Sequence, residues 1–119
     1  MTEKRAKLIY YISTGLLTAL TAFSAGMYFV NYEHVSEEFV KLGFPVYIIY
    51  PLAILKILGL VAIWTKKSRT LKEWAYAGFF FDFLLAGSAH LYAGDGEFGG
   101  AVFATILLLT SYLSWGKND

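Results

Sequence analysis

The pattern of hydrophobic and polar residues divides the chain into four long apolar stretches separated by short polar segments. The stretches cover residues 8–30, 44–64, 74–92 and 98–115. A helix needs about 20 predominantly apolar residues to cross a bilayer, and each stretch has this composition and approximate length. We therefore predict an all-α integral membrane protein with four spans in a single domain, residues 1–119.

The connections between the stretches are short, so consecutive helices should run antiparallel and side by side, as in an up-and-down four-helix bundle. The first connection contains Val35, Phe39 and Leu42 at helical spacing, and Gly43 and Pro45 follow as a helix stop. This pattern predicts a short amphipathic helix in the first outer loop. Two roles are open for it: a connector on the membrane surface, or a lid over a pocket that opens outward.

Basic residues are concentrated in alternate polar segments. They lie before the first stretch, in the second connection and in the tail: Lys4, Arg5, Lys7, Lys66, Lys67, Arg69, Lys72 and Lys117. The first connection holds only Lys41, and the third holds no lysine or arginine. By the positive-inside rule, a multi-pass protein with both termini in the cytoplasm is expected, in the inner membrane if the source is bacterial.

Acidic and aromatic residues agree with this orientation. The acidic residues of the first and third connections would lie outside: Glu33, Glu37, Glu38, Asp95 and Glu97. Tryptophan and tyrosine favour membrane interfaces. Trp64, Trp74 and Trp115 are predicted at the inner helix ends, and Tyr28, Tyr32, Tyr47, Tyr50 and Tyr92 toward the outer ends.

Composition narrows the function classes. Hydrophobic residues make up 57% of the chain and charged residues 16%, against roughly 25% charged residues in soluble domains. The 10 basic and 9 acidic residues nearly balance, so nothing favours nucleic-acid binding, which needs a clustered basic face. The sequence has no cysteine, which excludes disulfides, thiolate metal sites and dithiol redox chemistry. A redox role would therefore require a borrowed cofactor.

Two ionisable residues interrupt the apolar stretches near their middle: Lys56 in the second and Asp82 in the third. A charge inside a bilayer is costly unless it is paired or hydrated, so each is a candidate functional residue. The helical rise places both at similar depth in antiparallel neighbours. We expect a Lys56–Asp82 ion pair, which either only fixes the register of two helices or also lines a ligand pocket or proton path.

Small and polar residues recur at helical spacing in two stretches: Gly78, Asp82, Ala86 and His90 in the third, and Gly15, Thr18, Ala22 and Ala25 in the first. Such stripes let helices approach closely, and packing is their simplest explanation. Pro51 lies about one turn before Lys56 and predicts a kink there. A kink at this position would widen the outer half of the bundle.

Both histidines, His34 and His90, are expected on the outer side. Three interpretations are open: solvated or backbone-bonded residues, a two-histidine haem or metal site, or a pH-sensitive or ligand-contacting group in the case of His90. The hydroxyl side chains show no nucleophile–base spacing. We therefore predict no catalytic residue and no metal ligand, and take Lys56, Asp82 and His90 as candidate ligand-binding or buried polar residues.

Longer motifs also stand out: S-T-G-L-L-T-A-L and F-S-A-G-M-Y-F in the first stretch, K-L-G-F-P-V-Y-I-I-Y-P-L-A-I-L-K-I-L-G around Lys56, and L-K-E-W-A-Y-A-G-F-F-F-D-F-L-L-A-G-S-A-H around Asp82. Together they resemble the DoxX-like family of small four-helix integral membrane proteins over nearly the whole chain. The match is carried by Gly43, Pro45, Pro51, Lys56, Asp82 and His90.

The resemblance implies a compact four-helix bundle. Family members are linked to varied roles: a membrane subunit of a thiosulfate:quinone oxidoreductase, oxidative-stress responses and, in a distant animal branch, receptor assembly.

These observations favour a non-enzymatic membrane protein that binds an apolar small molecule, or a partner membrane protein such as a second copy of the chain, through Lys56, Asp82 and His90. No cofactor is assigned; quinone and lipid are the candidate ligands. A second hypothesis is a quinone-interacting subunit of an oxidoreductase, in which Lys56 or His90 bonds a quinone carbonyl and Asp82 handles protons. A third is a proton-coupled carrier that uses Lys56 and Asp82 as a protonation switch.

Overall fold

The computed structural model of the chain describes residues 2–65, 68–94, 96 and 98–115. Several charged residues of the predicted loops and tail lie outside this part: Lys66, Lys67, Asp95, Glu97 and Lys117. Among the described residues the fold is entirely α-helical, apart from one short 3-10 turn, and contains no strand. The prediction of an all-α protein is therefore confirmed.

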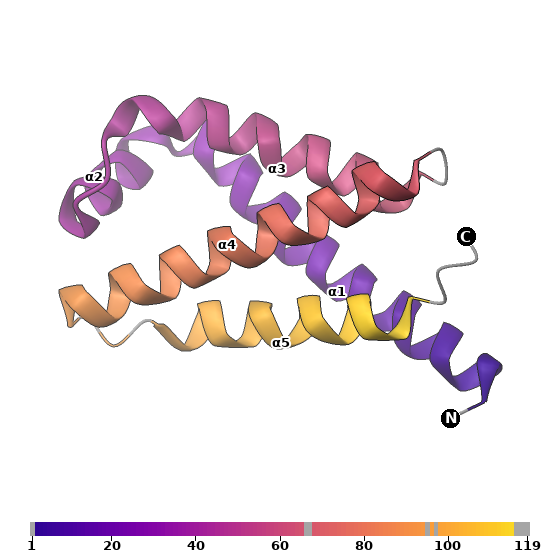
Figure 1. Cartoon of the computed structure of the whole chain (residues 1–119). Helices are drawn as coiled ribbons and strands as arrows, with labels where there is room; N and C mark the ends of the chain where they lie inside the picture. Colours follow the sequence, from indigo (N-terminus) through magenta and orange to yellow (C-terminus); the bar gives the residue numbers. More distant parts are fainter. Residues whose placement is uncertain (1, 66–67, 95, 97, 116–119) are drawn as a thin grey trace.

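Four long helices and one short one make up the described chain. In order they are α1 (Glu3–Val30), α2 (Tyr32–Leu42), the 3-10 turn η1 (Val46–Ile48), α3 (Ile49–Trp64), α4 (Arg69–Ala93) and α5 (Phe98–Ser114). Figure 1 shows that the start of α1, the end of α3, the start of α4 and the end of α5 lie at one end of the molecule. The short helix α2 lies at the opposite end, with the end of α4 and the start of α5. We call these two ends the N-terminal end and the α2 end.

Local capping explains where several helices begin and end. Thr2 accepts a hydrogen bond from the Arg5 amide at the start of α1, and Ser68 accepts one from the Leu71 amide at the start of α4. Gly43 follows α2 with φ of 83°, and Gly94 follows α4 with φ of 67°. Glycine adopts this left-handed conformation without steric cost, so it ends a helix readily.

The four long helices pack in a closed order: α1 contacts α3 and α5, and α4 contacts the same two helices. The larger core cluster draws residues from all four, with Leu17, Ile63, Phe79 and Leu108 as examples. A smaller cluster under α2 contains Val35, Phe39 and Ile49. The core is therefore dense toward the N-terminal end and thinner toward the α2 end.

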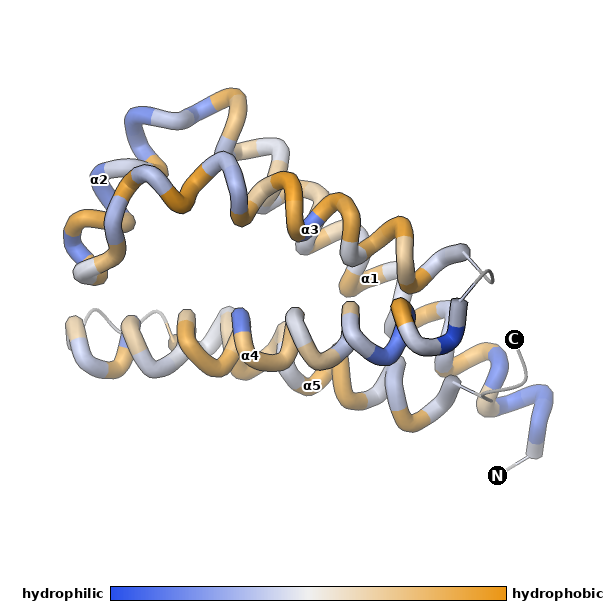
Figure 2. Tube along the Cα trace, turned by 45° about the horizontal axis from the view of Figure 1, so that its top comes forward, coloured by the Kyte–Doolittle hydropathy of each residue, from blue (hydrophilic) through white to orange (hydrophobic). Residues whose placement is uncertain are grey.

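The outward faces of the long helices are strongly apolar. Leu8, Phe23, Leu58, Leu85 and Leu113 are all more than half exposed. In Figure 2, hydrophobic colour covers much of α3 and α5, whereas hydrophilic colour gathers at the start of α1 and on α2. Within the described residues, two helical segments, Glu3–Val30 and Val46–Trp64, are long and apolar enough to cross a membrane, and α5 is apolar but shorter.

Two expectations about helix packing are wrong. A Cβ added at Gly15 would meet no atom within 4 Å, so this glycine is not the site of a close helix contact. That contact is at Gly59 instead, where a Cβ would lie 2.8 Å from the Phe79 ring. Pro51 lies in the first turn of α3, directly after η1. In a first turn the missing amide of proline has no partner within α3 to lose, so the reason for expecting a kink beside Lys56 falls away.

Candidate functional site

Lys56 lies almost fully inside the protein, with 9% of its surface exposed. It belongs to the buried stripe of α3, with Ala53 and Leu60 on neighbouring turns. Its Nζ donates hydrogen bonds to Ser24 Oγ at 2.9 Å and to Tyr28 Oη at 3.0 Å, both on α1. The ammonium also lies 4.4 Å from the centre of the Tyr28 ring, within cation–π range. The lysine is thus held by one serine and one tyrosine, one helical turn apart on α1.

The predicted ion pair between Lys56 and Asp82 is wrong. Lys56 donates to Ser24 and Tyr28 of α1, and it forms no ion pair with Asp82. The two residues nevertheless share a depth, because both line a cavity of about 370 Å³ between α3 and α4, the small cavity. The sequence located both charges but not the partner of the lysine.

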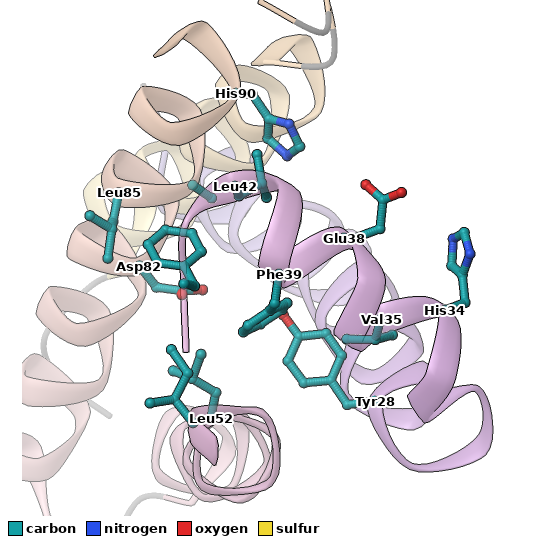
Figure 3. Close-up of a pocket in the computed structure, with 13 residues that line it drawn as sticks. Tyr28, His34, Val35, Glu38, Phe39, Leu42, Leu52, Asp82, Leu85 and His90 are labelled. Carbon is teal, nitrogen blue, oxygen red and sulfur yellow. The ribbon is translucent and has the colours of Figure 1, made fainter. Parts of the chain in front are cut away.

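A larger cavity of about 540 Å³ lies at the α2 end, between α2, α3 and α4, and we call it the large cavity. Its walls are mostly apolar, and its apolar lining residues include Val35, Phe39, Leu42, Phe44, Ile48 and Leu52. Its polar lining consists of Tyr28, His34, Glu38, Asp82 and His90. Figure 3 shows Asp82 and Tyr28 reaching into this space from different helices, with His34 and Glu38 on the far side of α2.

The stripe of α4 predicted from the sequence faces the two cavities. Gly78 and Asp82 line the small cavity, and Asp82, Ala86 and His90 line the large one. Asp82 and Leu52 belong to both linings, so the cavities adjoin at these residues. Of the three candidate residues, the structure therefore brings Asp82 and His90 to the large cavity and leaves Lys56 beside it, behind Tyr28.

The two histidines both border the large cavity, His34 from α2 and His90 from α4. His34 is exposed and His90 half-buried. Across the residues that the structure describes, no group of three or more histidine, cysteine, aspartate or glutamate side chains is arranged to hold a metal ion. The haem and metal interpretation of the histidines thus gains no support from this geometry.

A second buried lysine, Lys72, was missed by the sequence reasoning. Only 3% of its surface is exposed. Its Nζ donates to Tyr10 Oη at 2.8 Å and lies 4.8 Å from the Tyr10 ring and 4.4 Å from the Trp115 ring. The sequence pattern places Lys72 among the basic residues of the second connection. The signal was the Ser68 cap, which places Lys72 within α4, four residues before the buried Tyr76.

Two aromatic residues assigned to membrane interfaces lie inside the protein instead. Trp115 is 3% exposed and stacks on Tyr76 with ring centres 5.9 Å apart. Tyr28 is half-buried, because its hydroxyl accepts the bond from Lys56. Next to Trp115, Ser111 shares hydrogen bonds with Thr14 and with Tyr76. The N-terminal end therefore contains a dense network of polar and aromatic side chains that joins α1, α4 and α5.

Comparison with known proteins gives one match. A family model described as the DoxX-like family matches residues 12–114 of the chain. No curated protein and no solved structure matches it. The matched region includes both cavities and the two buried lysines.

Proposed function

We propose that this chain, which belongs to the DoxX-like family, is a multi-pass membrane protein that binds an apolar small molecule in the large cavity. In this proposal the four long helices form an antiparallel bundle across the bilayer, with both termini in the cytoplasm. The amphipathic helix α2 lies at the outer face and covers the cavity. The order of helix contacts and the apolar outer faces of α1, α3, α4 and α5 support this arrangement.

The size and chemistry of the large cavity carry the proposal. Small-molecule sites are typically clefts of about 300–1,000 Å³, lined mostly by apolar and aromatic side chains with a few polar groups. The large cavity, at about 540 Å³, falls in this range and contains Asp82 and His90 among mainly apolar walls. A half-buried carboxyl group beside an apolar cavity is costly to maintain in a membrane protein, which favours a role in recognition.

The lining also favours binding over catalysis. Its described residues include no serine, threonine, cysteine or lysine that could act as a nucleophile. Lys56 stands outside the lining and is occupied by Ser24 and Tyr28. We therefore propose a binding protein, with its ligand entering from the bilayer or from the outer side past α2.

The test is to find out what the protein carries. The chain is purified in mild detergent, washed, and extracted, and the released molecules are identified by mass spectrometry. Ala86 lines the large cavity, so Ala86→Phe should fill part of it. Ala77 is an exposed residue of the same helix outside that lining, and Ala77→Phe is the matched control.

The expected result is one apolar compound, retained by the wild type and by Ala77→Phe but lost from Ala86→Phe. A bound quinone would place the protein as a quinone-interacting subunit of an oxidoreductase. Identical bulk phospholipid from all three samples would contradict the proposal and favour a surface for a partner membrane protein.

A further inference from the structure

The polar groups of the large cavity restrict the headgroup of the ligand. The hydrogen bonds that these groups already form within the protein determine which donors and acceptors remain for a ligand. We propose, on the basis of the function above, that the ligand carries a hydroxyl group, which donates to Asp82 and accepts from Tyr28, and that Lys56 positions Tyr28 for this contact.

Tyr28 provides the donor. A phenol has one hydrogen to donate and lone pairs to accept with, whereas an ammonium group can only donate. In its bond with Lys56, Tyr28 therefore acts as the acceptor, and its own hydrogen stays available. Tyr28 makes no second hydrogen bond within the described part of the chain, and its side chain lines the large cavity. The lysine thus fixes the phenol oxygen and leaves the O–H for a ligand.

Asp82 provides the acceptor. It forms no hydrogen bond or ion pair with any described residue, and it lines the same cavity from α4. Figure 3 shows its carboxyl group and the Tyr28 hydroxyl coming from two sides of the cavity, with the Phe39 side chain between them in this view. Desolvation disfavours a carboxylate charge at Asp82, and the nearby Lys56 ammonium offsets a smaller part of that cost. Asp82 is half-buried, and a carboxylate that is partly withdrawn from solvent without a donor is unfavourable, so a ligand with a donor hydrogen reduces that cost.

A hydroxyl group satisfies both residues at once, and other headgroups do not. A quinone or ether oxygen accepts from Tyr28 but turns its lone pairs toward the carboxylate. An alkylammonium group donates to Asp82 but cannot accept from Tyr28, and it adds a second cation beside Lys56. The two sources of a suitable group are an apolar alcohol and a phenol, including the reduced form of a quinone.

The test compares probes that differ by one hydrogen-bonding feature. Binding of dodecanol, dodecyl methyl ether and dodecylamine to the purified protein in lipid nanodiscs is measured by competition with a fluorescent alkyl alcohol. A short-tailed quinol and the matching quinone are added as a second pair. The wild type should bind the alcohol about tenfold more tightly than the ether, the value of one hydrogen bond to a charged group. Quinol should exceed quinone by a similar factor.

Variants separate the roles of the three residues. Asp82→Leu should abolish the preference for alcohol over ether, because the ether never used the carboxylate. Tyr28→Phe should weaken alcohol and ether alike, and Tyr47→Phe, at an exposed tyrosine outside the lining, should leave both unchanged. As a positioning residue, Lys56 acts through Tyr28, so Lys56→Met should make a further Tyr28→Phe change nearly silent. A merely structural lysine would leave the two effects additive.

The outcomes distinguish this inference from the proposed function. If alcohol and ether bind equally and Ala86→Phe blocks both, the cavity binds ligands but the headgroup assignment is wrong. Tightest binding of the amine would also overturn the assignment. If no probe binds, or if Ala86→Phe changes nothing, the proposed function fails together with the inference.

Discussion

The structure buries two lysines among the residues it describes, one near the N-terminal end and one in the middle of α3, and both donate to a tyrosine of α1. Lys72 at the N-terminal end reaches Tyr10, and Lys56 toward the α2 end reaches Tyr28. Their surroundings differ. Lys72 is enclosed by a dense core and also contacts the Trp115 ring, whereas Lys56 and Tyr28 border cavities that Asp82 shares.

In the proposed function, the contact between a buried lysine and a tyrosine of α1 therefore has two different roles. At the N-terminal end the lysine, the tyrosine and the indole fill space, and the polar groups join three helices. Toward the α2 end the packing is left open, and the lysine holds a tyrosine whose side chain lines the large cavity. A buried charge that ties helices together contributes to stability, whereas one that borders an open cavity contributes to recognition.

The largest expected difference is between the two lysine variants. Lys72→Met removes the bond to Tyr10 and two cation–π contacts in a packed core. We expect the free energy of unfolding to fall by about 3 kcal/mol, from one buried hydrogen bond and a desolvated cation–π contact. Lys56→Met should cost only about 1 kcal/mol, because Lys56 lines the small cavity and its partner Tyr28 lines the large one. Unfolding in mixed micelles measures both, and an equal or larger loss for Lys56→Met would refute the division of roles.

The next effect concerns the contact between α3 and α4. A Cβ at position 59 would lie 2.8 Å from the buried Phe79 ring. Gly59→Ala should therefore destabilise the protein by about 1–3 kcal/mol through overpacking. Gly15→Ala is the control, since its Cβ would meet open space, and it should be neutral or slightly stabilising. If both variants unfold at the same denaturant concentration, the close contact is not as described.

The smallest expected effect is in the hydrogen-bond chain of the N-terminal end. Thr14→Val keeps the shape of the side chain but removes its bond to Ser111. Hydrogen bonds between membrane helices contribute roughly 0.6 kcal/mol on average, and we expect a loss of about that size, rising to about 1 kcal/mol. Thr110→Val is the control, because Thr110 donates only to the Ile106 carbonyl of its own helix. Equal losses from the two variants would show that the interhelical bond contributes nothing.

The helices could be predicted because long apolar stretches determine them. The stretch 8–30 lies within α1, and 44–64 contains η1 and α3. The stretch 74–92 lies within α4, and 98–115 contains α5. The helices α1 and α4 begin at Glu3 and Arg69, before their apolar stretches, because a helix can extend over charged residues outside the apolar span. The caps Thr2 and Ser68 extend both helices over those residues. Capping residues were thus a better guide to the helix start than the first uncharged position.

The site could be predicted only in part. Charges within apolar stretches identified Lys56 and Asp82, and helical spacing placed Asp82 and His90 on one face. The contacts of Lys56 could not be predicted, because depth along a helix does not say which neighbour a side chain faces. Tyr28 was missed for a related reason: a tyrosine near a helix end looks the same in sequence whether it points to lipid or to a buried ammonium.

Photolabelling would test binding in the large cavity most directly. The wild-type protein in nanodiscs is labelled with a long-chain alcohol that carries a diazirine, with and without excess dodecanol, and the labelled peptides are sequenced. The account predicts labelling that dodecanol suppresses at cavity residues such as Leu52 and Phe39. Unsuppressed labelling spread over outward-facing residues such as Leu20 and Leu113, with none at the cavity, would contradict it.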